Sequence, residues 1–365
     1  MSKEKYYRLD NIIAKKADYH ILFGERSNGK SYAVSERALY EAYTERDFDT
    51  GEPISDYEFG YIRRWDMDIK ASKIDSYFGD KVDLIKKMTN NEYDCVSTYR
   101  GIIYLAKIDE KTMKPVRGKR IGVAFALTGA THYKSLQFPK IRNIIFEEFL
   151  VQGGYLPEEP KTLQSLISTI ARKRKVKVFM IGNTESRICP YIDEWSLVNM
   201  LRQKQGTIDV YVFHGEDSEI RIACEYCASS DTKGKMFFGQ SSKMINGGVW
   251  DSNVHQNFVK PFKDMTVLYN ILYEYNRFRF IISLVVIDND LCLAVRRGKD
   301  NKDYNKIVRI VSNHFNISPC ATLYLTPLLR YDKVVIDLLN NDKIMFSDNL
   351  TGTEFYTIKK ERGKF

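Results

Sequence analysis

The sequence predicts an α/β protein, with a mostly parallel sheet in a larger first domain and a smaller, mixed α/β second domain. Three observations lead to this prediction. Between about residues 18 and 200, apolar runs of strand length alternate with amphipathic runs of helix length, a pattern typical of a parallel sheet covered by helices. A glycine-rich loop joins the first of these runs to the second. Beyond residue 203 the alternation gives way to short strand-like runs and polar turns.

Run length and hydrophobic periodicity place each element. Strands are expected at 19–23, 57–63, 102–106, 121–127, 141–146 and 176–182. Helices are expected near 30–45, 68–89, 161–173 and 190–202. Because a charged turn around Lys111–Lys119 separates 102–106 from 121–127, these two strands are expected to form an inserted β-hairpin.

The change in the pattern of apolar runs near residue 203 also predicts the domain boundaries. We assign residues 1–202 to the first domain, 203–250 to a linker region and 251–365 to the second domain. In the second domain, Arg277–Ile287 and Leu291–Val295 flank a short polar turn and predict a second β-hairpin.

Composition narrows the class of protein. A chain of 365 residues with 44% hydrophobic side chains can build cores in two domains. The formal net charge of +9 suits a polyanionic partner, and residues 228–365 carry 20 of the basic but only 14 of the acidic side chains. The sequence contains no run of 18 apolar residues and no apolar core of a signal peptide near Met1. We therefore expect a cytosolic protein that is neither secreted nor bound to a membrane.

The cysteines are scattered, which suits a reducing compartment better than a disulfide framework. Cys224 and Cys227 form a C-x-x-C pair with no second pair at zinc spacing. Use of this pair for a metal or for redox chemistry remains an alternative to two ordinary thiols.

Residues Gly24–Ser31 match G-x-x-x-x-G-K-[ST], the phosphate-binding loop of P-loop NTPases, and lie between a predicted strand and a predicted helix. Lys30 is expected to reach the β- and γ-phosphates of ATP, and the Ser31 hydroxyl to ligate Mg²⁺ at the positive end of the helix. The alternative is a glycine-rich turn with an incidental lysine. The predicted nucleotide contacts are Gly24, Glu25, Arg26, Ser27, Asn28, Gly29, Lys30, Ser31 and Tyr32.

A second motif is the apolar strand Ile144-Ile145-Phe146, which ends in Glu147 and Glu148. We expect both carboxylates to face the phosphates, with Glu147 holding Mg²⁺ and Glu148 polarising the attacking water. The plain alternative is a charged strand terminus.

Two polar segments follow this strand. Asn183 comes directly after the next apolar strand and is expected to sense the γ-phosphate, although an Asn after Gly is also a common turn residue. The basic cluster Arg172–Lys175 is the natural source of an arginine that enters the site of a neighbouring subunit. A solvated helix end is the alternative explanation for the cluster.

These motifs resemble those of the DNA-packaging ATPases, or encapsidation proteins, of small short-tailed podoviruses of the Picovirinae type, which are related to large terminases and to FtsK-HerA ASCE ATPases. The resemblance covers the first 200 residues well. Over the remainder it rests only on the length of the chain and on the pattern of strand-like runs. It rests on Gly24–Ser31, Tyr61–Trp65, Ile144–Phe149, the basic cluster, Gly182–Thr184 and Pro190-Tyr191.

The resemblance implies an ATP-driven motor in the host cytoplasm. Its subunits would form a ring, expected to be a pentamer, on the portal or connector of the procapsid and move double-stranded DNA into it. Whether a packaging RNA also binds stays open. The resemblance assigns catalysis to Glu148, coupling of hydrolysis to motion to Asn183, and the arginine finger to Arg172, with Arg174 as second choice. Asp66 stands where the family has a lysine.

The resemblance also implies an RNase H-like second domain without its nuclease metal site. Phe278–Ile287 contains no acidic residue, whereas a two-metal nuclease needs converging carboxylates from central strands. We therefore expect a nuclease-dead domain that grips DNA through its phosphates, with a steep dependence on salt. The candidate contacts are Arg296, Arg297, Lys299, Lys302, Lys306 and Arg309.

Three other functions remain as alternatives. A small-molecule P-loop kinase would need an acceptor pocket and a lid, and the paired glutamates argue against it. A nucleotide-dependent DNA-binding switch would bind ATP without turnover stimulated by DNA. An active terminase nuclease would cut plasmid DNA in the presence of Mn²⁺.

Overall fold

A large, mostly parallel sheet organises the first of the two units into which the chain divides, Met1–Trp250 and Asp251–Phe365. The structure is a computed structural model and describes residues 7–54, 57–214, 219–228, 250, 255–258, 261–298, 309–312, 321–322 and 330–362. Among these residues, no helix combines the length and the apolar character needed to cross a bilayer.

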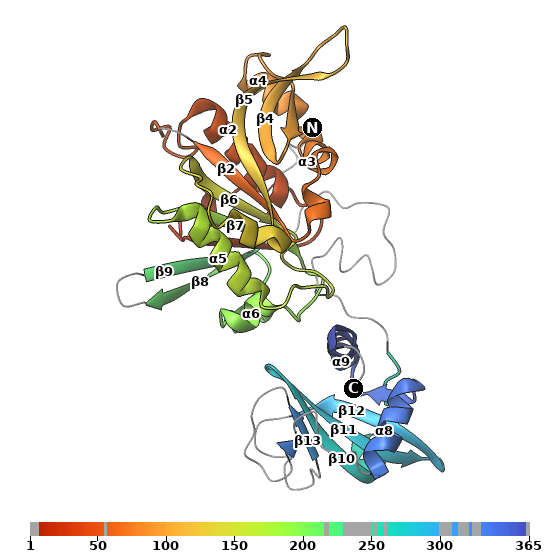
Figure 1. The fold of residues 1–365 in the computed structure, drawn as a ribbon. Coiled ribbons are helices and arrows are strands. Elements are labelled where there is room, and N and C mark those ends of the chain that lie inside the picture. Colours follow the sequence, from red (N-terminus) through yellow and green to blue (C-terminus); the bar gives the residue numbers. More distant parts are fainter. Residues whose placement is uncertain are drawn as a thin grey trace, which may run out of the picture. The chain divides into compact units, whose positions relative to one another are not determined.

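The described part of the first unit contains a nine-stranded sheet with the order β3-β4-β5-β2-β6-β7-β1-β9-β8 (Figure 1). Its strands are β1 (Tyr19–Gly24), β2 (Glu58–Arg63), β3 (Cys95–Tyr99), β4 (Ile102–Ile108), β5 (Pro115–Ala126), β6 (Ile141–Glu147), β7 (Lys177–Asn183), β8 (Thr207–His214) and β9 (Glu219–Tyr226). The run from β5 to β9 is parallel, and the edge strands β3, β4 and β8 pair antiparallel.

Helices cover both faces of this sheet. Along β1, Ile21 and Phe23 face the core beneath α5, whereas Leu22 faces the core beneath α2, because successive side chains of a strand point to opposite faces. Both faces are apolar, which is why the parallel strands form nearly continuous apolar runs. The helical elements are α1 (Asp10–Ile13), α2 (Lys30–Thr44), η1 (Asp66–Ile69), α3 (Ala71–Tyr77), η2 (Gly79–Lys81), α4 (Val82–Met88), η3 (Leu127–Tyr133), α5 (Glu159–Ala171), α6 (Pro190–Glu194) and η4 (Val198–Leu201).

The structure corrects several sequence-based expectations. The helix expected over 68–89 is broken into η1, α3, η2 and α4, and the helix over 190–202 is broken into α6 and η4. Strand β3 was not expected, and β5 starts six residues before the predicted 121–127. The hairpin of β4 and β5 forms as predicted.

The expected linker over 203–250 is also corrected. β8 and β9 lie within it, and β9 pairs in parallel with β1, so this segment completes the first sheet. Cys224 and Cys227 belong to this region and are fully buried core residues. The sequence did not indicate this strand, because β9 is a short run of mixed polar and apolar residues. Its burial depends on β1, a strand about 200 residues earlier in the chain.

The described part of the second unit contains a six-stranded sheet with the order β14-β13-β10-β11-β12-β15. Its elements are η5 (Phe262–Asp264), β10 (Thr266–Tyr275), β11 (Phe278–Ile287), β12 (Asp290–Arg297), β13 (Arg309–Ser312), β14 (Ala321–Thr322), α8 (Arg330–Asn340), β15 (Ile344–Phe346) and α9 (Asn349–Arg362). An antiparallel meander of β10, β11 and β12 is extended beside β10 by parallel β13 and β14. This mixed α/β arrangement agrees with the fold class expected from sequence.

The predicted hairpin of the second unit is confirmed as β11 and β12. Its two turn residues, Asp288 and Asn289, have φ values of 50° and 70°. Two consecutive residues with positive φ are typical of the tight turn that matches the twist of paired strands, and Asp and Asn tolerate it well. β10, the partner of β11 on its other side, was not expected.

Candidate functional site

The loop between β1 and α2 has the backbone that a phosphate-binding loop needs. Gly29 precedes α2 with φ 96°, and Ser27 has φ 63°. Lys30, the first residue of α2, is only 4% exposed, and its Nζ donates to the carbonyl of Glu25 and to Asn28 Oδ1 at 3.1 Å. Burial lowers the pKa of Lys30, and the nearby Cys227, Glu147 and Glu25 oppose this shift. The loop therefore holds an ammonium group at the positive end of a helix.

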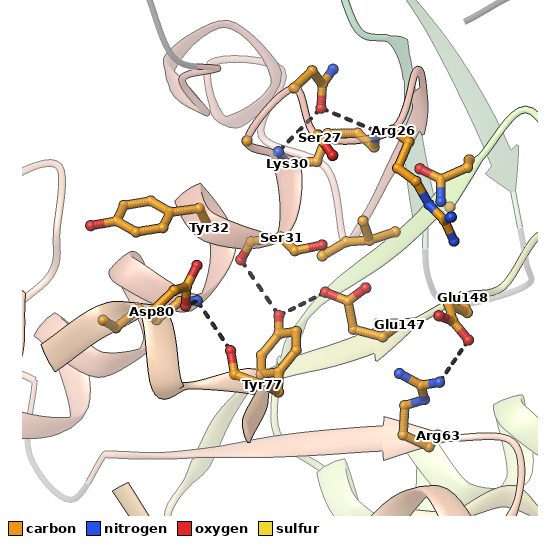
Figure 2. Close-up of a pocket in the computed structure, with 16 residues that line it drawn as sticks. Arg26, Ser27, Lys30, Ser31, Tyr32, Arg63, Tyr77, Asp80, Glu147 and Glu148 are labelled. Atoms are coloured by element: carbon orange, nitrogen blue, oxygen red, sulfur yellow. Dashed lines mark hydrogen bonds and ion pairs between the residues drawn. The ribbon is translucent and has the colours of Figure 1, made fainter. Parts of the chain in front are cut away.

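Glu147 ends β6 and faces this loop. It is 6% exposed, and burial raises the pKa of its carboxyl group. Its Oε1 accepts a hydrogen bond of 2.7 Å from the hydroxyl of Tyr77, the last residue of α3 (Figure 2). The Tyr77 hydroxyl also lies 3.4 Å from the carbonyl oxygen of Ser31. The carboxylate and the Ser31 end of the loop are thus held together by a side chain that sequence reasoning did not single out.

Glu148 is the next residue, and the chain turns there with φ 59°. Its side chain is 54% exposed, and its Oε2 accepts from the guanidinium of Arg63 at 2.6 Å (Figure 2). Arg63 ends β2, the strand beside β6. Because the chain turns at the strand end, Glu147 and Glu148 both line one cavity of about 740 Å³ that also holds Lys30.

Asn183 reaches the same cavity from β7, the strand between β6 and β1. It pairs in register with Gly24, the first residue of the loop. At Gly182 an added Cβ would approach the Phe149 side chain to 2.9 Å, so glycine lets the chain after β6 pack against β7. The ends of four parallel strands therefore bring Arg63, Glu147, Glu148, Asn183 and the loop after β1 to one edge of the sheet.

A buried ion pair fixes the backbone behind Glu148. Both nitrogens of the Arg64 fork bind the Glu159 carboxylate, at 2.7 and 2.9 Å, with side chains 5% and 0% exposed. Arg64 also donates to the carbonyls of Glu148, at 3.1 Å, and Phe149, at 3.3 Å. Glu159 additionally accepts from the hydroxyl of Tyr191 at 2.8 Å. In the sequence, Arg64 was used only as part of the family resemblance. The feature that could have indicated its role is the pair of adjacent arginines at the end of a predicted strand.

The two finger candidates lie away from the cavity. They follow α5 and precede β7, whereas Asn183 is at the far end of β7. Arg174 donates to three main-chain carbonyls, those of Phe138, Ile141 and Ile170, at 2.7–2.8 Å. Arg172 is exposed and makes a hydrogen bond of 3.2 Å to the carbonyl of Leu136. Arg174 is therefore a structural residue here, which corrects its use as second choice.

The structure places the predicted DNA contacts in different environments. Arg309 is only 7% exposed and its guanidinium binds Asp332 of α8, so we remove it from the set. Arg297 stacks over Phe280 at 5.1 Å and pairs with Glu354. On the same strand, Arg296 stacks over the ring of Phe262 at 4.7 Å. The remaining candidates, Lys299, Lys302 and Lys306, lie outside the described residues.

Comparison with known proteins gives the family. The sequence profile of the podovirus DNA encapsidation protein (Gp16) family matches residues 1–347. The chain belongs to this family. The DNA packaging proteins of Bacillus phages PZA and phi29 are each 23% identical to it over 361 residues, which cover 92% of this chain and 96% of the relative. The corresponding protein of Bacillus phage B103 is 24% identical over 334 residues, covering 86% and 92%.

Two solved structures share the fold of this chain. The bacteriophage phi29 viral genome packaging motor assembly matches with a TM-score of 0.54 and 19% identity over 98% of this chain and 99% of that chain. The phi28 gp11 DNA packaging motor matches with a TM-score of 0.50 and 16% identity, covering 98% of both. The match to the family profile confirms the expectation of an encapsidation protein.

Proposed function

We propose that this encapsidation protein is the ATP-driven subunit of a motor that moves double-stranded viral DNA through the portal into the procapsid. The cavity beside Gly24–Ser31 carries the proposal, because Lys30, Glu147, Glu148 and Asn183 meet there. The relatives named DNA packaging proteins support the same function. We propose the host cytoplasm as its location, with transient residence on the procapsid.

The residues present fit Mg²⁺ bound with ATP. Magnesium prefers oxygen ligands, and the Ser31 hydroxyl and the Glu147 carboxylate would supply them. The buried Glu147 carboxylate, whose pKa burial raises, suits a cation beside it, since a positive charge would offset the cost of that burial. Bound Mg²⁺ neutralises phosphate charge during phosphoryl transfer.

The remaining cavity residues have separate tasks in this proposal. Lys30 binds the β- and γ-phosphates, and Asn183 orients the attacking water. Glu148 accepts the proton of that water and is placed for this by its exposed carboxylate and its ion pair with Arg63. A kinase would have to exclude water from the same place, so the half-exposed Glu148 disfavours the kinase alternative.

A ring of subunits is part of the proposal, with five subunits as the expected number. β7 is about 20 Å long from Lys177 to Asn183, at 3.3 Å for each residue of a parallel strand, and Arg172 precedes its far end. Arg172 therefore could not serve the cavity of its own chain, and we propose that it enters that of a neighbour. Proposed partners are double-stranded DNA, the portal, other copies of this chain and, as an open case, a packaging RNA.

For the second unit we propose a nuclease-dead, DNA-gripping domain. Arg296, Arg297, Lys299, Lys302 and Lys306 remain the proposed phosphate contacts. Binding through phosphates would be independent of sequence and would weaken steeply with salt. We expect no cuts when plasmid DNA is incubated with the protein and Mn²⁺; cutting would favour the nuclease alternative.

The motor proposal is tested by mixing the protein with portal-bearing proheads, double-stranded DNA and ATP. We expect DNA to become protected from added nuclease, and ATP hydrolysis to rise when DNA and proheads are both present. Lys30→Ala should lose both signals because it lacks the phosphate-binding ammonium. A protein that stays monomeric and ignores nucleic acid even beside proheads would contradict the proposal. Single-turnover hydrolysis with no stimulation of turnover by DNA would favour the switch alternative.

Tyr77 gives a prediction about the metal end of the cavity. Tyr77→Phe removes the donor that holds Glu147, and losing such a partner of a metal ligand weakens metal affinity about 10–100-fold. We expect a correspondingly higher Mg²⁺ concentration for half-maximal binding of a fluorescent ATP analogue. Tyr43→Phe is the matched control, because Tyr43 donates to the exposed Glu92 at 3.0 Å. An unchanged Mg²⁺ requirement in Tyr77→Phe would show that the hydroxyl does not position Glu147.

A further inference from the structure

The segment between β2 and β3 forms one wall of the nucleotide cavity and brings a lysine that no motif of the sequence contains. Tyr77 and Asp80 of this segment line the cavity together with Lys30 and Ser31 (Figure 2). Lys81 lines the same cavity. Tyr77 is engaged with Glu147. Lys81 belongs neither to the phosphate-binding loop nor to the strand end at Glu147 and Glu148.

Lys81 is a buried cation, with its side chain 2% exposed. Its Nζ donates to Asp80 Oδ1 and, at 3.3 Å, to the carbonyl of Tyr77. The Asp80 side chain is 64% exposed, so water screens the attraction between the two charges. Burying an ammonium group costs free energy unless a strong partner compensates it. The exposed carboxylate is a weak partner for a cation held this deeply.

Two aromatic rings that line the cavity lie beside the ammonium group. Its Nζ lies 5.1 Å from the ring centroid of Tyr32 and 5.2 Å from that of Tyr77, distances at which a cation is attracted to a ring face. Tyr32 directly follows Ser31, and Tyr77 binds Glu147. Both rings therefore belong to residues at the metal end of the cavity, where the charge of a triphosphate is greatest.

We propose that Lys81 is a second lysine that binds the phosphates of ATP in the cavity of its own chain. The proposal rests on the proposed ATP-binding function. A phosphate oxygen would replace the solvent-facing Asp80 carboxylate as the acceptor, and the two tyrosine rings would keep the ammonium directed into the cavity. Lys81 then adds a second positive charge to that of Lys30, as a point charge that tolerates several phosphate geometries.

A purely structural role is the alternative. Tyr77 is the last residue of α3, and a lysine that binds a carbonyl at a helix C-terminus stabilises that end. Such a role would affect the stability of the first unit and leave nucleotide affinity unchanged. The test must therefore measure binding and stability separately.

The experiment compares Lys81→Met, Lys81→Gln and Lys81→Arg in the full chain, with displacement of a fluorescent ATP analogue by MgATP as the binding assay. Loss of one charged hydrogen bond predicts that Met and Gln weaken MgATP about 10–100-fold, whereas Arg, which keeps the charge but has a larger head group, should weaken it less. Lys73→Met is the matched control, because Lys73 of α3 is 54% exposed and pairs with Asp68 at 2.6 Å. This control should change affinity less than about twofold.

The outcomes separate the possibilities. Tryptophan fluorescence during denaturation reports whether each variant folds, and Lys81→Gln serves if Lys81→Met does not. MgATP affinity equal to that of the unaltered chain in a folded Met or Gln variant would overturn the assignment of Lys81 alone. Failure of the unaltered chain to bind MgATP would instead refute the proposed ATP-binding function.

Discussion

The Glu148→Gln variant is expected to bind ATP as tightly as the unaltered chain and to hydrolyse it about 10²–10⁴-fold more slowly, the usual contribution of a positioned general base. Glutamine has nearly the same shape as glutamate but cannot accept the proton of the attacking water. Its side-chain oxygen can still accept from Arg63, as Oε2 of Glu148 does at 2.6 Å. The charge that remains is that of Arg63, whose side chain is 18% exposed and would keep this hydrogen bond to the glutamine oxygen.

The measurement pairs single-turnover ATP hydrolysis, on proheads with DNA, with displacement of a fluorescent nucleotide. Glu110→Gln is the control: this carboxylate is exposed in the turn between β4 and β5 and should leave both rates and affinity unchanged. Normal hydrolysis by Glu148→Gln would show that another group activates the water. We expect the variant to retain bound ATP and to protect no DNA.

The Arg64→Met variant is expected to lower the free energy of unfolding of the first unit by about 3–5 kcal/mol, the typical cost of breaking one side of a buried ion pair. Glu159, whose side chain is 0% exposed, would lose its cationic partner. The hydroxyl of Tyr191 and the amide of Leu156 would remain as its donors. The carbonyls of Glu148 and Phe149 would also lose their donor, so ATP hydrolysis should fall even where the variant is folded.

The chain offers a direct readout for this variant. Its three tryptophans, Trp65, Trp195 and Trp250, all lie in the first unit, so tryptophan fluorescence in urea follows the unfolding of that unit alone. The double variant Arg64→Met with Glu159→Gln should be more stable than Arg64→Met, because the uncompensated charge is gone. Lys161→Met, which breaks the exposed pair with Glu158, should cost less than about 1 kcal/mol. Equal stability of Arg64→Met and the unaltered chain would contradict the structural role of the pair.

Features written in contiguous residues were predictable. The order of strand, glycine-rich loop and helix around Gly24–Ser31 is local, and so is the apolar strand that ends in Glu147 and Glu148. The parallel arrangement of β1, β6 and β7 brings their carboxyl ends to one edge, which is why Asn183 could be expected near the loop. The tight turn at Asp288 and Asn289 was equally local.

Contacts between distant segments were not predictable. Tyr77 is 70 residues from Glu147, and Arg64 is 95 residues from Glu159. Such pairs depend on how the insertion after β2 and the helix α5 pack on the sheet, and no period in the sequence encodes that packing. For the same reason Arg309 looked like a surface arginine, although β13 and α8 bury it against Asp332.

The amino-acid sequence by itself determined the phosphate-binding loop, the acidic strand end and the alternating α/β order, because each arises from neighbouring residues and a fixed hydrophobic period. Only the tertiary structure decided that β9 completes the first sheet beside β1, that Tyr77 holds Glu147, and that Lys81 is buried in the cavity wall. These depend on long-range packing, in which the free energy of burying a side chain is set by partners that lie far away along the chain.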